Sequence, residues 1–417
     1  MMPFTDASER LRTEIVAEIE ARGPIPFARF MELCLYHPVL GYYTRGLGGG
    51  GGRDYLTSSG IHRAFGHLLA RQVEEMWRRA GRPDPYYFVE FGPGEGYFAL
   101  DFLQEAARSG GFAKSLCYVM VEPSPVLAER QRSRLAGPAS TAVHWLGEQD
   151  LDRRAKFPGC LFANEVLDAF PVHRVMGTPE GPLEIHVAVR AGRTQEILAP
   201  LSSEAVGRFL SESGIVLEDG QEIDLNLAAP CWVSWAVGLL RRGYLIVVDY
   251  GHEAPELYAP RRRRGTLLAY HRHRINEDFL ERPGEQDLTA HVDFTAIGRA
   301  AEAAGARRLG LTTQACFLLA LGALDFVQDP ATAAAGEGHE PAGRLLDTLK
   351  DREALKELIL PGRMGDRFQV QMLGVGDVPT DLAGLSRPWA RPRETAAAAP
   401  PSPPRGAALV EESEDRP

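Results

Sequence analysis

The sequence is poor in cysteine and lacks any long hydrophobic run. Its five cysteines stand far apart, at positions 34, 117, 160, 231 and 316, and none belongs to a C-x-x-C pair. That spacing disfavours both a zinc site and a disulfide framework, and it favours a reducing compartment. Because no run approaches 18 consecutive apolar residues, we expect no membrane span.

Positive charge is also in short supply. The chain has 46 Lys and Arg against 56 Asp and Glu, a formal charge of −10 at pH 7. Nucleic-acid binding needs basic surfaces that neutralise phosphates, so we expect no nucleic-acid partner. Residues 1–20 carry acids throughout and lack an apolar core, unlike a signal or transit peptide. These absences predict a cytoplasmic enzyme or binding protein.

The middle of the chain alternates strand-like and helix-like segments. Strands are expected at 86–92, 116–123, 141–146, 160–164, 243–251, 306–314 and 367–376, and helices at 96–110, 124–137, 230–242, 294–305 and 342–360. Such alternation predicts parallel β-α-β units, and hence an α/β fold with a doubly wound sheet.

We divide the chain into three parts. Residues 1–83 form an N-terminal helical region, with helices at 8–22, 27–35 and 57–77 and five consecutive glycines at 48–52. The glycine run is either a solvated linker or a mobile flap over a ligand. Residues 84–376 form the α/β domain, with insertions at 173–228 and 252–292 that break the alternation. The Pro/Ala-rich, acidic tail at 377–417 is expected to stay disordered, because it cannot bury enough surface to fold.

A glycine-rich loop follows the first strand, in the stretch FVEFGPGEG. Gly92, Gly94 and Gly96 place no side chain between the backbone and a ligand, so a nucleotide-like group can approach closely. Glu122 ends the second strand, where the hydroxyls of a ribose would need a carboxylate. A tight turn followed by an acid near a helix start is the purely structural alternative.

The details of this loop favour one cofactor over another. A dinucleotide site has the spacing G-x-G-x-x-G, but here the third glycine comes one residue early and Glu95 lies inside the loop. Acids at Glu95 and Glu90 would repel a pyrophosphate and attract an ammonium and a sulfonium. The pattern therefore favours S-adenosylmethionine (AdoMet) over NAD. Gln149 and Asp150, after the third strand, are candidates to bind the adenine amino group, although a polar loop explains them equally well.

The segment LFANEVLDAFPV at 161–172 places polar groups in an apolar stretch. Asn164, Glu165 and Asp168 follow the fourth strand. Burying a carboxylate without a partner is costly, so these groups are exposed, paired, or available to a cationic ligand. Capping of the next helix is the alternative explanation.

Several stretches together resemble the MidA-type class I methyltransferases, relatives of the mitochondrial complex I assembly factor that methylates an arginine of a complex I subunit. They are MELCLYHPVLGYY, DYLTSSGIHRAFG, VEFGPGEG, VEPSP, ANEVLDAFPV, VDYGH and PGEQDLTAHVDF, and the resemblance runs from about residue 24 to 375. It implies a seven-stranded, mostly parallel, Rossmann-like sheet with AdoMet at the carboxyl ends of its strands. It also implies an arginine of a protein substrate as the acceptor, with symmetric dimethylation of a respiratory complex I-type subunit as one form of that activity.

The resemblance assigns roles to the polar residues. The fourth strand of this fold ends beside the methyl group, so Glu165 is predicted to clamp a guanidinium, and Asp168 to share the clamp or accept a proton. Asn164 belongs to the same motif and is assigned to the cofactor. His291 of DLTAHVDF is predicted to bind the clamp or take a proton, with a satisfied core histidine as the alternative.

Three histidines and a basic run remain to be interpreted. His252, His271 and His273 lack the spacing of a metal site, so no metal is expected. The basic run at 261–264 is either a solvated loop or a docking site for an acidic partner. Two rival functions remain open: a non-catalytic AdoMet-binding assembly chaperone and an NAD-dependent oxidoreductase.

Overall fold

A computed structural model describes residues 4–48, 58–137, 143–153, 155–272, 274–327 and 341–386. Most of the expected glycine flap, and the tail from residue 387 onward, therefore lie outside the described residues. Within the described part, no helix is long and apolar enough to span a membrane.

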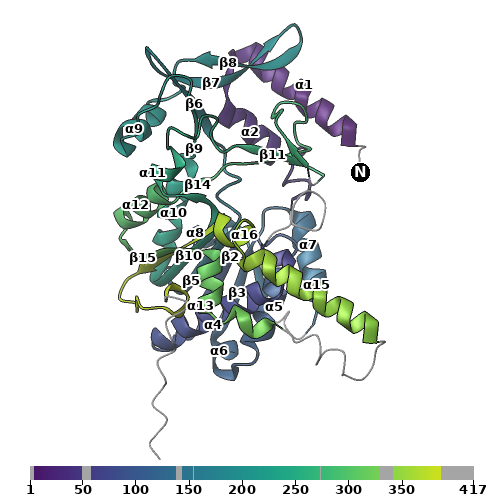
Figure 1. Cartoon of the computed structure of the whole chain (residues 1–417), viewed down its shortest axis with the longest axis vertical. Coiled ribbons are helices and arrows are strands. Elements are labelled where there is room, and N and C mark those ends of the chain that lie inside the picture. Colours follow the sequence, from purple (N-terminus) through teal and green to yellow (C-terminus); the bar gives the residue numbers. More distant parts are fainter. Residues whose placement is uncertain are drawn as a thin grey trace, which may run out of the picture.

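The core is an eight-stranded sheet in which seven strands run in the order β15-β16-β10-β5-β2-β3-β4, and short β14 pairs with β10 (Figure 1). Strand β16 is antiparallel to both neighbours, whereas β10, β5, β2, β3 and β4 are mutually parallel. This confirms the mostly parallel methyltransferase-like sheet. The strands are β2 (Tyr86–Phe91), β3 (Leu116–Val121), β4 (Val143–Leu146), β5 (Phe157–Asn164), β10 (Leu240–His252), β14 (Val292–Asp293), β15 (Ala306–Thr313) and β16 (Phe368–Val375).

Both faces of this sheet are buried, which explains why its strands read as continuous apolar runs. Alternate residues of β2 point to opposite faces: Phe88 packs in one hydrophobic cluster and Val89 in the other. The first cluster includes α4 (Ala64–Arg79), α5 (Tyr97–Ala106), α6 (Gly110–Ser115), α13 (Gln314–Ala320) and α15 (Pro341–Ile359); the second includes α8 (Glu148–Asp152), α10 (Ala228–Leu239) and α12 (Phe294–Ala303). Helix α7 (Pro125–Arg134) follows β3, and α16 (Met364–Arg367) precedes β16.

The N-terminal helices share a third core with parts of both insertions, whereas other parts of the insertions, such as Val206 and Leu257, pack in a fourth. Residues of α1 and α2, such as Leu11 and Phe30, pack with Val187 of the first insertion and Leu288 of the second. In Figure 1 these elements form the upper part of the molecule. They are α1 (Phe4–Arg22), β1 (Ile25–Pro26), α2 (Phe27–Tyr36), β6 (His173–Thr178), β7 (Gly181–Arg190), β8 (Arg193–Ala199), α9 (Glu204–Ser213), β9 (Glu222–Leu225), α11 (Ala254–Leu257), β11 (Leu268–His271), β12 (Arg274–Asn276) and β13 (Asp287–Thr289).

The insertion at 252–292 contains a small sheet, in which β11 pairs with both β12 and β13. Two expectations about the N-terminal region need correction. The helix expected at 57–77 is two helices, α3 (Ser58–Ile61) and α4, and the His62 ring between them accepts a hydrogen bond from the Ala64 N–H (3.0 Å). Because α4 packs on α5, it belongs to the sheet domain and not to a separate N-terminal unit.

The expected disorder from residue 377 onward is wrong for residues 377–386. Val378 and Leu382 are buried in the cluster around the main sheet, and η3 (Ala383–Leu385) follows them. The Tyr244 hydroxyl donates to the Pro379 carbonyl (3.1 Å), and Asp381 pairs with Arg79. Apolar residues at intervals of about four are enough to anchor this short stretch to the domain.

Candidate functional site

A cavity of about 630 Å³ lies at the carboxyl ends of β2, β3, β4 and β5. Its volume falls in the range of small-molecule sites, and its position is where open α/β sheets bind ligands. Of the residues predicted from the sequence, eight line it: Glu90, Gly92, Gly94, Glu122, Gln149, Asp150, Asn164 and Glu165. The last predicted glycine, Gly96, sits just beyond the cavity and begins α5.

The glycine loop needs its glycines. Gly92, Gly94 and Gly96 have φ of 61°, 53° and 80°, in the left-handed region that favours glycine. A Cβ on Gly92 would lie 3.0 Å from Val166, and one on Gly96 would lie 3.3 Å from the side chain of Gln131. The loop thus packs tightly against its neighbours and leaves bare backbone toward the cavity.

Gln131 connects this loop to Glu122. Its amide nitrogen donates to the Gly94 carbonyl (2.7 Å) and to Glu122 Oε2 (3.1 Å), while its oxygen accepts from the Trp145 indole N–H (3.0 Å). The other Glu122 oxygen accepts from the Ser124 N–H (2.8 Å). Sequence reasoning missed Gln131, which stands among charged residues; its helical spacing from Leu127 and Ala128, which are also buried, was the available signal.

Two carboxyl groups in the cavity have displaced pKa values. Burial raises the pKa of Glu122 to about 7, against the opposing effect of the Ser124 N–H and the Gln131 amide. Burial also raises the pKa of Glu90 to about 8, although the Tyr118 hydroxyl donates to it (2.6 Å). At pH 7 and without a ligand, Glu90 is mostly protonated and Glu122 about half protonated, and a cation or a hydroxyl donor would favour their ionised forms.

AdoMet affinity is expected to rise with pH until Glu122 is ionised in the free protein. Below its pKa of about 7, binding must release the proton, so affinity falls by up to about tenfold per pH unit. The same raised pKa means that the free protein loses stability as pH rises from 4.5 through about 7. Calorimetric titration across this range measures the slope. Glu90 titrates in the same cavity, so the part of the pH dependence that is due to Glu122 is the part that Glu122→Gln removes. If the affinity of that variant depends on pH as steeply as that of the wild-type protein, Glu122 is not the group that releases the proton.

Glu95 behaves differently from the sequence-based expectation. Its carboxylate pairs with Arg130 (2.8 Å) and Arg134 (3.3 Å). These two guanidinium groups neutralise its charge, so repulsion of a pyrophosphate by Glu95 is a weaker argument against NAD than the sequence suggested.

Asn164 and Glu165 form one polar unit at the end of β5. The Asn164 amide donates to Glu165 Oε1 (2.9 Å), and the Glu165 N–H donates to the Val248 carbonyl (3.0 Å). Glu165 has a φ of 54°, a costly conformation for a residue with a side chain, and such conformations concentrate at functional sites. Among the described residues, the buried Asn164 Oδ1 has no hydrogen-bond partner, so it can accept from a ligand.

Asp249 holds the loop that carries Glu165. It is fully buried at the end of β10, and its Oδ2 accepts from the N–H groups of Val166 (3.3 Å), Leu167 (3.0 Å) and Asp168 (3.3 Å). Its Oδ1 accepts from the N–H of the next residue, Tyr250 (2.9 Å). Asp249 belongs to the motif VDYGH, which contributed to the family resemblance, but no pattern in the sequence predicted that its side chain holds this loop.

Asp249→Asn is expected to destabilise the protein by about 1–3 kcal/mol, because asparagine has one acceptor oxygen and its NH2 group must face either the three loop N–H groups or the Tyr250 N–H. Thermal denaturation measures the loss. The matched control is Asp347→Asn on the exposed face of α15, which should leave the midpoint unchanged. Equal midpoints for Asp249→Asn and the wild-type protein would show that this carboxylate does not hold the loop.

Asp168 does not face the cofactor cavity. It is buried and lines a second cavity of about 250 Å³, together with Tyr250 and Tyr270. Burial, with further effects from Asp249 and Asp287, raises its pKa well above the ordinary value. The loop after β5 therefore lines both cavities, with Glu165 in the first and Asp168 in the second. This corrects the expectation that both carboxylates border one cavity.

His291 lines neither cavity. Its ring stacks on Tyr250 with centroids 6.2 Å apart and lies 5.6 Å from the ring of His252. Burial, together with the neighbouring His252, Arg262 and Arg367, lowers the pKa of His291 to about 4. At neutral pH His291 is an uncharged, weakly basic ring that packs against Tyr250, a residue that lines the second cavity. The prediction that His291 takes part at the reacting centre is therefore not supported.

Two tyrosines from the N-terminal region complete the cofactor cavity. The Tyr36 hydroxyl donates to the Ala169 carbonyl (3.0 Å), the Tyr43 hydroxyl donates to Asp287 Oδ1 (2.7 Å), and their rings stack with centroids 5.6 Å apart. These contacts join α2 and the second insertion to the loop after β5. Tyr36 and Tyr43 are far in sequence from the other residues of the cavity, so no local sequence pattern predicted that they line it.

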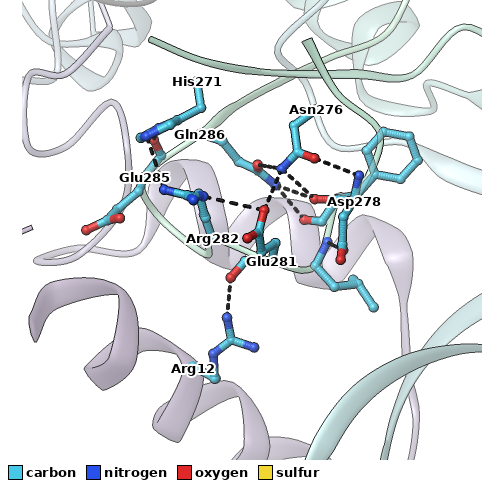
Figure 2. Close-up of polar contacts among 10 residues, drawn as sticks. Arg12, His271, Asn276, Asp278, Glu281, Arg282, Glu285 and Gln286 are labelled. Atoms are coloured by element: carbon cyan, nitrogen blue, oxygen red, sulfur yellow. Dashed lines mark hydrogen bonds and ion pairs between the residues drawn. The ribbon is translucent and has the colours of Figure 1, made fainter. Parts of the chain in front are cut away.

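The loop that leads into Asp287 is fixed by its own polar contacts (Figure 2). The Asn276 amide donates to Glu281 Oε2 and to Gln286 Oε1, both at 3.1 Å, and Gln286 donates to the Phe279 carbonyl (2.8 Å). Arg12 of α1 donates to the Glu281 carbonyl. Gln286 of the motif PGEQDLTAHVDF therefore fixes the loop next to Asp287, which in turn holds Tyr43 at the cofactor cavity.

The remaining candidates have ordinary partners. Among the described residues, no group of three His, Cys, Asp or Glu side chains is arranged to hold a metal. The ring of His252 lies 3.0 Å from Arg262, and that of His271 lies 2.9 Å from the Glu285 carbonyl; His273 lies outside the described residues. In the basic run, Arg261 and Arg262 pair with Glu256, and Arg263 pairs with Glu218.

Comparison with known proteins identifies the family. Residues 68–312 match the family model described as "Putative S-adenosyl-L-methionine-dependent methyltransferase". A crystal structure from Burkholderia thailandensis, described as a "likely methyl transferase" bound to S-adenosyl-homocysteine, is similar with a TM-score of 0.81 at 33% identity, covering 93% of this chain and 98% of that one. The chain belongs to this family of AdoMet-dependent methyltransferases.

Named relatives share the same region. The protein arginine methyltransferase NDUFAF7 of Xenopus tropicalis is 28% identical over 348 residues, 76% of each chain. The human protein of the same name is 27% identical over 390 residues, 85% of this chain and 81% of that one. The resemblance stated from sequence motifs is thus confirmed, as are AdoMet as the cofactor and the methyltransferase class of enzyme. The NAD-dependent alternative is set aside.

Proposed function

We propose that this methyltransferase acts on an arginine side chain of a protein substrate. The observation that carries the proposal is the Glu165 carboxylate, which lines the cofactor cavity and is held by Asn164 and by a strained backbone. A guanidinium is flat, always charged and weakly hydrated, and it pairs bidentately with a carboxylate. Relatives of this chain that are named protein arginine methyltransferases support the same substrate class.

The residues of the cavity fit AdoMet. The bare backbone at Gly92 and Gly94 allows a close approach, and Glu122 is placed for the ribose hydroxyls. The unpartnered Asn164 Oδ1 and the buried Glu90 carboxyl suit the ammonium of the methionine part. Gln149 and Asp150 line the end assigned to adenine, although Asp150 Oδ2 also accepts from the Gly147 N–H (3.1 Å).

Bound AdoMet supplies an electrophilic methyl group on a positively charged sulfur, and its loss leaves the bonding electron pair on that sulfur. Glu165 contributes by holding the guanidinium so that one terminal nitrogen, which forms the new N–C bond, faces the methyl group. Positioning of this kind supplies on the order of 7–11 kcal/mol in favourable cases.

The nitrogen must also release a proton. Asp168 lines the second cavity on the same loop. Burial raises its pKa and so disfavours its charged form; an arriving guanidinium favours that form again, and the carboxylate is then a stronger base than an ordinary aspartate. We assign it the role of proton acceptor at the second cavity. This role replaces the shared clamp expected from the sequence.

The identity of the substrate is a finer proposal. The resemblance to MidA-type proteins points to a subunit of a respiratory complex I-type enzyme as the substrate. Mass spectrometry of methylarginine peptides in wild-type and deletion cells tests both the reaction and the target. We expect a methylarginine peptide that is lost in the deletion strain. Rescue of that strain by a variant unable to bind AdoMet would instead favour an assembly chaperone.

A further inference from the structure

The second cavity has one buried carboxyl group and two exposed guanidinium groups among its lining residues. Its walls come from α3, the loop after β5, β10, β11, β13 and the α15–α16 region, which meet here from distant parts of the chain. Asp168 is the buried acid, whereas Arg363 and Arg367 are exposed cations contributed by the segment before β16. The rim of the cavity is therefore basic, and the acid in its wall is a buried carboxyl group whose charged form is disfavoured.

One of the two rim arginines is already neutralised. Arg363 Nη1 lies 2.5 Å from Glu357 Oε2, and Glu357 lines the same cavity. Arg367 forms no hydrogen bond or ion pair with any residue that the structure describes. The rim thus offers one cation, at Arg367, that is available to a bound molecule.

Tyr270 lines the same cavity as the acid and this cation. Its pKa is raised by burial and by Asp168, and Arg367 opposes that rise. Both charged groups are therefore within electrostatic range of one ring that lines the cavity. Tyr250 also lines this cavity, and burial, with further effects from Glu165 and Asp168, raises its pKa. The loop that carries Glu165 and Asp168 lines both cavities.

We propose that the second cavity admits the substrate arginine and that Arg367 binds an acidic residue close to it in the substrate chain. The guanidinium passes between the Tyr250 and Tyr270 rings toward Glu165, which suits its flat and weakly hydrated face. The neighbouring carboxylate stays at the exposed rim and pairs with Arg367. Arg367 is then a specificity-determining residue that selects acid-flanked arginines. This inference rests on the proposed arginine methyltransferase function and extends it.

The direct test is binding of short fluorescein-labelled peptides to the full protein saturated with S-adenosylhomocysteine, measured by fluorescence anisotropy. Each peptide has one central arginine, and its flanking positions carry glutamate, glutamine or lysine. The glutamate-flanked peptide is expected to bind about three- to fivefold more tightly than the glutamine-flanked one, as is usual for an exposed ion pair. Arg367→Glu should reverse the order, so that the lysine-flanked peptide binds best.

Lys350→Glu is the matched control, because it makes the same change in net charge on an exposed position of α15 away from both cavities. It should keep the wild-type order of affinities. Failure of the glutamate-flanked peptide to bind, equal affinities for the three peptides, or an unchanged order in Arg367→Glu would each overturn the inference. A peptide with citrulline in place of the arginine distinguishes failure of the proposed function from failure of this inference. If it binds as well as the arginine peptide, the proposal that arginine is the acceptor is wrong, whatever the effect of the flanking charges.

Discussion

Glu165→Gln is expected to slow methyl transfer by about 100-fold or more, the usual loss when one preorganised electrostatic contact at a reacting centre is removed. Glutamine has the same shape, so its amide oxygen can still accept from Asn164, and the backbone at this position need not change. What is lost is the charge that pairs with the guanidinium. Single-turnover transfer from labelled AdoMet to the substrate identified in cells measures the effect.

The affinity for AdoMet is the internal control of this experiment. It should stay within about twofold of the wild-type value, because the main anchors assigned to the cofactor are elsewhere, at the glycine loop and Glu122. Glu204→Gln, an exposed residue of α9, removes the same charge and should be neutral in both assays. Normal AdoMet binding combined with a full transfer rate in Glu165→Gln would mean that this carboxylate is not the clamp.

Glu122→Ala is expected to weaken AdoMet binding by about 10- to 100-fold. Hydrogen bonds to a charged acceptor contribute about 1.5–3 kcal/mol each, and the ribose would lose this acceptor. The substitution also removes the partner of Gln131, which ties the helix after β3 to the Gly94 carbonyl. Isothermal titration calorimetry with S-adenosylhomocysteine measures the change without turnover.

Glu129→Ala provides the comparison, since Glu129 is an exposed acid of the same helix, α7. It should bind the cofactor as the wild-type protein does. Gln131→Leu keeps Glu122 but cuts its link to the loop, so it should weaken binding in the same direction by a smaller factor. If Glu122→Ala matches Glu129→Ala, Glu122 contributes no contact to the ribose.

Those parts of the site that depend on local order could be predicted from the sequence. The glycine loop and Glu122 each follow a strand directly, and parallel strands bring their carboxyl ends to the same edge of the sheet. Asn164 and Glu165 were found for the same reason. The central strands could also be predicted, because burial on both faces makes each of them a continuous apolar run.

Other parts depend on contacts between distant segments, which a single sequence does not display. Asp249 acts on a loop 81–83 residues away, and Tyr43 contacts an aspartate 244 residues away. Glu165 and Asp168 line different cavities, and the backbone at Glu165 is left-handed; residue spacing reveals neither feature. The order at 377–386 likewise depends on a surface that only the folded domain provides.

Transfer of a labelled methyl group tests the central claim most directly. Lysate of deletion cells is incubated with the purified protein and AdoMet that carries a deuterated methyl group, and the labelled peptides are sequenced by mass spectrometry. Our account predicts the label on the side-chain nitrogen of an arginine, and none of it with Glu165→Gln in a reaction of the same length. Label on any other residue type, or no protein label while AdoMet binds normally, would contradict it.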